Sequence, residues 1–108
     1  MGYDLHITRA TDWTENIGVK IQADEWLALV QEDPDLNLDP SHGPYAVSWS
    51  GSKEPGWFDW YDGNVFTTDP SRATVGKMLA LAETLAGMVQ GDEGEVYEST
   101  RDWRARTT

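Results

Sequence analysis

The segment WFDWYDGNVF, residues 57–66, constrains the fold of this chain more than any other. Asp62-Gly63 at its centre is a strong signal for a type I′ turn, because both central residues of that turn need positive φ. Aromatic and β-branched residues, which favour strands, lie on both sides of the turn. The segment therefore predicts a β-hairpin whose strands cover 57–61 and 65–68.

Side chains alternate between the two faces of a strand, and this separates the aromatic residues of the hairpin into two groups. Phe58 and Trp60 share one face, and Trp57, Asp59 and Tyr61 share the other. A carboxylate that faces the core costs free energy. We therefore predict that Phe58 and Trp60 are buried and that the other three residues lie on an open face.

The side taken by Phe66 depends on the length of the hairpin loop. A two-residue loop at Asp62-Gly63 pairs Phe66 with Asp59. A loop lengthened by Asn64 pairs Phe66 with Trp60 instead, which moves its ring to the other face. The sequence leaves both registers open.

Further segments show the periodicity of regular structure. Alternating apolar residues predict strands at 3–8 and 45–50, and the segment 88–98 predicts a last short strand or hairpin. Apolar stripes with helical spacing predict helices at about 23–32 and about 70–86.

The second helix carries its own end signals. Asp69 suits the N-cap, Pro70 the first helical position and Gly87 the end. Gly76 lowers helix propensity, so we expect it to permit a close backbone approach.

The predicted order of elements is β-α-β-β-β-α-β. This order is typical of an α+β fold, with a mainly antiparallel sheet of about four to five strands and two helices on one face. The 108 residues fit one domain. We place it at 1–98 and expect a polar C-terminal tail at 99–108, in which Trp103 is the anchored residue.

The net charge of −11, from 19 acidic and 8 basic residues, limits the classes of partner. Phosphate binding draws on Lys and Arg, so we expect neither nucleic acid nor an anionic membrane as a partner. No apolar run approaches the ~20 residues of a membrane span, and no signal peptide is visible. We expect a cytoplasmic protein that associates with a basic protein.

The sequence offers few groups for catalysis or metal binding. It contains no Cys and two His, and it has no phosphate-binding glycine loop, nucleophile elbow or metal-spaced His cluster. We therefore assign no catalytic residue, metal or cofactor. The acids of 33–39 alternate as at the start of a calcium loop, but Leu38 replaces its turn glycine and Pro44 its bidentate Glu.

Three interpretations of the open sheet face follow. In the first, exposed aromatic and acidic residues dock on a basic protein. Its residues are Trp57, Asp59, Tyr61, Asp33, Asp35, Asp92, Glu93 and Glu95. In the second, a small-molecule-binding domain or minor enzyme uses a site around His6, Asp59 and Tyr61, since a His beside a carboxylate can act as an acid–base pair. In the third, Trp57 and Tyr61 only cover the sheet.

Four segments carry a resemblance to a known group of proteins. They are YDLHITRATDW, EWLALVQEDPDL, WFDWYDGNV and KMLALAETLAGMVQGDEGEVY. Together they resemble a group of small, uncharacterised bacterial proteins over nearly the whole chain up to Tyr97, and that group has no assigned catalytic residues. Such small, acidic, single-domain proteins are similar in character to immunity proteins, which neutralise secreted toxins. The resemblance implies that the basic partner is a toxin domain.

Overall fold

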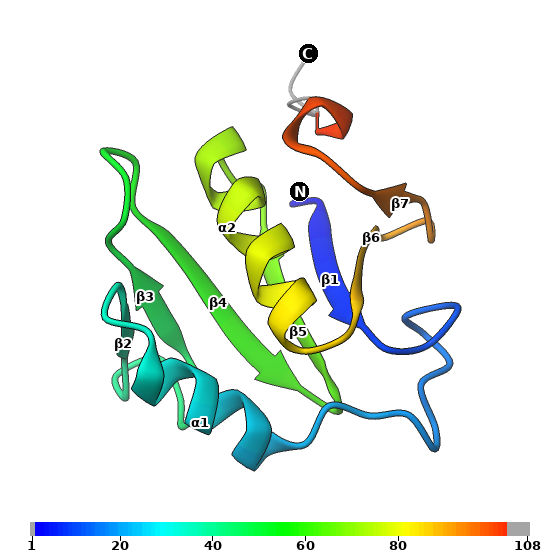
Figure 1. Ribbon diagram of the computed structural model, residues 1–108, viewed down its shortest axis with the longest axis horizontal. Helices are drawn as coiled ribbons and strands as arrows, with labels where there is room; N and C mark the ends of the chain where they lie inside the picture. The colour runs from blue at the N-terminus through cyan, green and yellow to red at the C-terminus, as the bar shows by residue number, and fades with distance from the viewer. Residues whose placement is uncertain (1, 104–108) are drawn as a thin grey trace.

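The computed structural model describes residues 2–103, which form one antiparallel sheet with both helices on the same side of it (Figure 1). The strand order is β2-β3-β4-β5-β1-β6-β7. The strands are β1 (Asp4–Thr8), β2 (Leu36–Leu38), β3 (Val47–Trp49), β4 (Gly56–Tyr61), β5 (Asn64–Thr68), β6 (Met88–Gly91) and β7 (Val96–Tyr97). The helices are α1 (Ala23–Glu32), α2 (Arg72–Thr84) and the 3₁₀ helix η1 (Thr100–Asp102).

The predicted α+β class is confirmed, but seven strands exceed the predicted four to five. The extra strand β2 lies in the acidic segment after α1, where Leu36 pairs with Trp49 and is buried. Three residues are too few for an alternating pattern to show. The segment 88–98 divides into β6 and β7 around a turn in which Gly94 has a φ of +85°.

The hairpin of β4 and β5 takes the two-residue register. Asp59 lies opposite Phe66, so the Phe66 ring is on the open face with Asp59. Asp62 and Gly63 have φ values of +48° and +89°, as a type I′ turn requires. Phe58 is fully buried on the helical side, and Trp60 donates its Nε1–H to the carbonyl of Ile21 at 2.9 Å.

Helix α2 begins later than predicted. Ser71 is the N-cap, and its Oγ accepts from the amide of Thr74 at 3.2 Å. The predicted cap, Asp69, was wrong: it has a φ of +45° and its carboxylate accepts from the amide of Tyr3 instead. Pro70 therefore precedes the helix.

The core lies between the sheet and the two helices. Its largest fully buried side chains are Trp26 from α1, Phe58 from β4, Leu5 and Ile7 from β1, and Met78 from α2. Trp26 also donates its Nε1–H to the carbonyl of Tyr45 at 2.9 Å, which ties α1 to the segment before β3.

The C-terminal segment joins this core as far as Trp103. The Trp103 ring is buried, lies 6.0 Å from the ring of Tyr97, and donates its Nε1–H to the carbonyl of Pro70. A Cβ on Gly76 would lie 3.3 Å from a side-chain methyl carbon of Thr100 in η1, so the neighbour at this glycine is a side chain and not the backbone that was expected. The rest of the predicted tail, 104–108, lies outside the described residues.

Candidate functional site

The sheet face opposite the helices carries a row of directly paired residues. The row runs from Asp59 in β4 to Phe66 in β5, then to His6 in β1 and Gln90 in β6. The predicted neighbourhood of His6 and Asp59 therefore exists, but Phe66 stands between them. The two residues do not form a direct acid–base pair.

Trp57 and Tyr61 leave much of their ring surface uncovered on this face. Their exposed fractions are 42% and 74%. The Trp57 ring meets Phe66 edge-on, with the ring centroids 5.7 Å apart. Asp59 lies between Trp57 and Tyr61 along β4, so the predicted trio of Trp57, Asp59 and Tyr61 shares the open face.

A loop of residues 9–20, which we call the covering loop, closes one end of this face. Its Trp13 ring stacks on the His6 ring, with centroids 3.7 Å apart and planes 7° from parallel. The Trp13 amide donates to the Gln90 side chain at 2.9 Å, and the Trp13 carbonyl accepts from the Asn64 side chain at 2.8 Å. These contacts explain why His6 is buried although it faces away from the helices.

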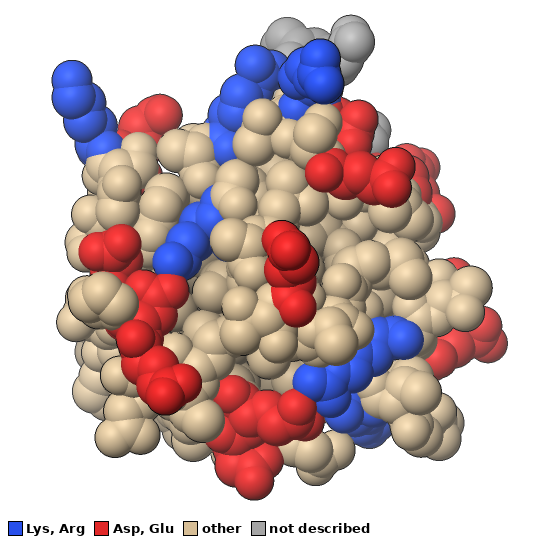
Figure 2. All heavy atoms as spheres, viewed as in Figure 1, with Lys and Arg blue, Asp and Glu red and all other residues tan. Residues whose placement is uncertain are grey.

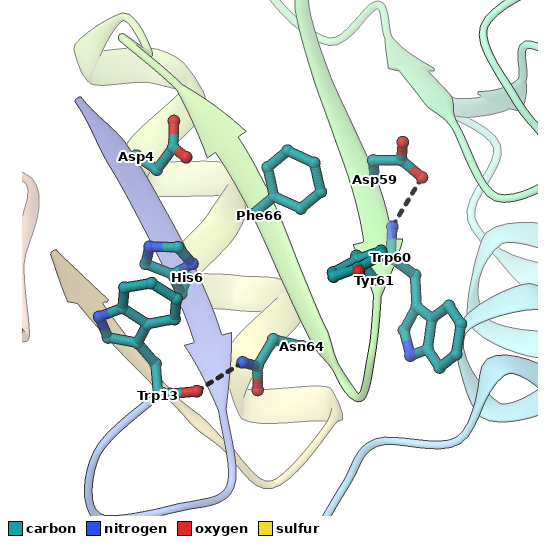
Figure 3. A pocket seen from close by; sticks show the side chains of 8 residues that line it. All are labelled: Asp4, His6, Trp13, Asp59, Trp60, Tyr61, Asn64 and Phe66. Carbon is teal, nitrogen blue, oxygen red and sulfur yellow. Dashed lines mark hydrogen bonds between the residues drawn. The ribbon is translucent and has the colours of Figure 1, made fainter. Parts of the chain in front are cut away.

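The covering loop and the hairpin enclose a first hollow of about 290 Å³ (Figure 3). Its lining residues are Asp4, His6, Trp13, Asp59, Trp60, Tyr61, Asn64 and Phe66. Figure 3 shows the stacked rings of His6 and Trp13 on one side and Tyr61 on the other, while the indole of Trp60 points away. Carboxylates, aromatic rings and one amide thus surround this space.

A second hollow of about 460 Å³ adjoins the first, because both contain Asp59 and Phe66. It is lined by Asp39, His42, Ala46, Trp57, Phe58, Asp59 and Phe66. In the part of the chain that the structure describes, neither hollow is lined by a Lys or Arg. By contrast, Figure 2 shows basic side chains among acidic ones on the face that carries the helices.

Asp59 is the most unusual charged residue of this face. Partial burial raises the pKa of its carboxyl group, and a hydrogen bond from the Trp60 amide at 2.8 Å offsets only part of that effect. Within residues 2–103, no Lys, Arg or His forms an ion pair with it. A partly buried carboxylate without an ion-pair partner gains electrostatic stabilisation when another molecule places a cation beside it.

His6, Asp92 and Asp4 form a polar cluster beside the first hollow. The Nε2 of His6 lies 2.8 Å from Asp92, whose other oxygen accepts from the Asp4 amide at 3.0 Å. One ligand atom from each residue lies within 4.8 Å of the others, so this set is the group in residues 2–103 that could hold a metal ion. Hydrogen bonds within the chain already account for the arrangement, because Asp4 also accepts from Thr68.

A second His–carboxylate pair borders the other hollow. His42 Nδ1 lies 2.8 Å from Asp39, and Ser41 Oγ lies 2.5 Å from the second oxygen of that carboxylate. Hydrogen bonds from Ser41 and then His42 lower the pKa of Asp39. Ser41 Oγ also lies 3.2 Å from His42 Nδ1, but its shorter bond donates to the Asp39 carboxylate. Residues 39–42 therefore form a turn that these local hydrogen bonds account for.

The other predicted acidic residues lie apart from the trio. Asp33 and Asp35 both precede β2, the strand at one edge of the sheet. Asp33 pairs with Lys77 at 2.5 Å, and this bond lowers the pKa of Asp33. Asp92, Glu93 and Glu95 lie between β6 and β7 at the opposite edge. The predicted partner-binding set is therefore spread over both edges and the middle of the sheet.

Several lining residues were not predicted as part of a site. Trp13 covers His6, and no local pattern signals this because its partners Asn64 and Gln90 are distant in sequence. The position of the Phe66 ring on the open face is set by the two-residue hairpin register, which the sequence left open.

Comparisons with protein-family models, with curated proteins and with solved structures find no match. Within residues 2–103, no helix has both the length and the apolar character needed to cross a bilayer.

Proposed function

We propose that this protein is a binding module of the immunity type, which neutralises a bacterial toxin by docking a basic part of it onto the open sheet face. The observation that carries the proposal is the setting of Asp59. It is a partly buried carboxylate without an ion-pair partner in residues 2–103, and it lies between the exposed rings of Trp57 and Tyr61.

The aromatic rings supply the kind of surface that protein partners use. Trp and Tyr are enriched among the residues that dominate binding energy, and they carry large apolar area with few rotatable bonds. Trp57 and Tyr61 are both held on a strand, and Trp57 also packs against Phe66. Their contact surface is therefore largely formed before any partner arrives.

The charge of the chain favours a basic partner. Its net charge of −11 creates a field that speeds the approach of a cationic protein and slows that of an anionic one. Asp33, Asp35, Asp92, Glu93 and Glu95 contribute to this field from the two edges of the sheet. We assign direct contact to Trp57, Asp59 and Tyr61, and long-range attraction to the edge acids.

The test uses the purified chain and the product of the neighbouring gene, which the proposal expects to be a toxin, with binding followed by surface-immobilised association. We expect a complex whose association rate falls at least about tenfold between low and high salt. Tyr61→Ala should weaken the complex about tenfold or more. Leu38→Ala is the matched control, because Leu38 is an exposed apolar residue on the edge strand β2. No complex, or equal effects of the two substitutions, would contradict the proposal.

The first hollow supports a second candidate, a small-molecule site around His6, Asp59 and Tyr61, all of which line it. His6 is held by Asp92 and Trp13, so its ring has a fixed orientation toward this space. A screen of small cationic ligands against the wild type and His6→Gln tests it. Ligand binding that survives His6→Gln unchanged would argue against a role for the imidazole.

A further inference from the structure

We infer that the first hollow accepts one arginine side chain of the protein partner, with its guanidinium group on Asp59 and its flat faces against aromatic rings. This inference rests on the proposed function and goes further, since it names the group recognised and the place where it binds.

The charges that line the hollow favour a cation. Asp4 and Asp59 both border it, and no Lys or Arg among residues 2–103 lines it. Among the lining residues, His6 carries the one imidazole, and its Nε2 already forms a hydrogen bond with Asp92. A cation that enters this space meets two carboxylates and no residue that is always positively charged.

Asp59 has the capacity to bind a forked donor. One of its oxygens accepts from the Trp60 amide, and the other has no hydrogen-bond partner within residues 2–103. Guanidinium groups donate two parallel hydrogen bonds to a carboxylate, whereas an ammonium group acts as a point charge. Because Asp59 is partly shielded from water, such a pair is stronger here than at a fully exposed carboxylate.

The rings around the hollow favour a flat cation. Tyr61 lies on the Asp59 side, the stacked rings of His6 and Trp13 form the other side, and Phe66 lies between the two sides (Figure 3). A guanidinium group stacks on aromatic faces and is less strongly hydrated than an ammonium group. These properties favour arginine over lysine.

The size of the hollow favours a side chain over a whole small molecule. Its volume of about 290 Å³ is at the lower limit for ligand pockets, which range from roughly 300 to 1,000 Å³. Free arginine would also bring a zwitterionic α-amino acid group, which must lose hydration to enter a space of this size. An arginine within a peptide brings no such group.

The test is an NMR titration of the ¹⁵N-labelled chain with Nα-acetyl-arginine amide, which imitates an arginine within a protein. The Trp60 amide and the Trp13 indole report on the hollow, because one donates to Asp59 and the other lines the space. The indoles of Trp26 and Trp103 are internal references on the helical side. We expect saturable shifts of the two reporters with an affinity on the order of millimolar, as for a fragment of this size.

Three ligands and two variants complete the design. We expect weaker binding of the lysine analogue and of free arginine, and none of the uncharged citrulline analogue. Asp59→Asn should weaken arginine-amide binding at least about tenfold. Asp24→Asn, at an exposed carboxylate on α1, should leave it unchanged.

Each other outcome overturns the inference in a defined way. Equal chemical-shift changes with the citrulline analogue would show that the hollow does not recognise the positive charge. Binding of free arginine as tightly as of the arginine amide would indicate a small-molecule site. No shift of the Trp60 amide would place any binding elsewhere. A complex with the toxin domain that is weakened by Tyr61→Ala would leave the proposed function standing in each case, so the two failures are distinguishable.

Discussion

At the scale of single residues, ionised Asp59 lowers the stability of the folded chain, whereas the proposed function uses it to bind the partner. Its charged form is less well solvated in the folded chain than in the unfolded chain, which is why burial raises its pKa. A carboxylate that costs stability and has no ion-pair partner within residues 2–103 is typical of a functional position. This contrast gives a stability test that needs no partner.

We expect Asp59→Asn to raise the melting temperature at pH 7. The Asn side chain keeps an oxygen for the Trp60 amide and removes the charge. Because the folded pKa lies above the unfolded value of about 3.9, ionised Asp59 lowers stability above the folded pKa, and this cost disappears as the pH falls below the unfolded pKa. Thermal unfolding at neutral pH and near pH 3 should therefore show a gain that shrinks with acid. A lower melting temperature at pH 7 would show that Asp59 is structural.

Ala86 is strained, and the strain is open to test. It has a φ of +56° at the end of α2, where the Gly87 amide bonds back to the carbonyl of Ala82. A glycine takes this left-handed position without the Cβ clash, so Ala86→Gly should stabilise the protein by roughly 0.5–1 kcal/mol.

Ala80→Gly is the matched control for that substitution. Ala80 is exposed in the middle of α2, where glycine should cost about 1 kcal/mol. Urea unfolding of the two variants should move in opposite directions. If Ala86→Gly and Ala80→Gly both destabilise the protein, the inference that Ala86 is strained is contradicted.

At the scale of elements, the β4–β5 turn positions both Asp59 and Phe66. Gly63 has a φ of +89°, and a Cβ there would lie 2.5 Å from the Lys20 side chain in the covering loop. We expect Gly63→Ala to cost about 2 kcal/mol or more in urea unfolding.

Gly18 separates the two causes of that cost. It has a similar φ of +86°, but a Cβ there would meet nothing within 4 Å. Gly18→Ala should therefore cost only the backbone strain, about 1 kcal/mol. Equal costs at both positions would show that the contact between the turn and the covering loop is unimportant.

An ion pair fixes α1 to the end of β1. Arg9 donates to both oxygens of Glu25 and also to the carbonyl of Leu85, and the bonds from Arg9, helped by the Gln22 amide, lower the pKa of Glu25 to about 2. A lowered folded pKa adds stability above the unfolded value of about 4.3, and that stability is lost as the pH falls toward 2.

We therefore expect Glu25→Gln to be less stable than the wild type at pH 7 and nearly equal to it near pH 2. Circular dichroism during acid titration gives the comparison. Glu32→Gln is the control on the same helix, because Glu32 is exposed and forms no ion pair in the described part of the chain. If the stability difference between Glu25→Gln and the wild type stays constant with pH, the ion pair is contradicted.

The elements that could be predicted are those whose signals are local. Helix α1 and the β4–β5 hairpin follow from apolar periodicity and from the Asp62-Gly63 turn. Strand β2 could not be predicted, because three residues in an acidic segment show no period and Leu36 is fixed only by its pairing with Trp49. The predicted start of α2 was wrong because Asp69 and Ser71 are both suitable N-caps. The hydrogen bond from the Tyr3 amide occupies the Asp69 carboxylate and leaves Ser71 as the cap.

At the scale of the whole molecule, the sheet divides the chain into a closed side and an open side. The helices bury one face, and the covering loop reaches only part of the other. Strand parity predicted which residues of β4 face outward. It could not predict the hollows, because their walls combine the covering loop, β1, β4 and β5. The site is thus a property of the assembled sheet.

The most direct measurement of the central claim is protection of cells that express the product of the neighbouring gene, which the proposed function expects to be a toxin. Growth is compared for the wild type, Asp59→Asn and the control Asp24→Asn at equal protein levels. We expect Asp24→Asn to protect like the wild type and Asp59→Asn to fail, although its melting temperature is no lower. Full protection by Asp59→Asn would contradict the claim that the open sheet face binds the partner through this carboxylate.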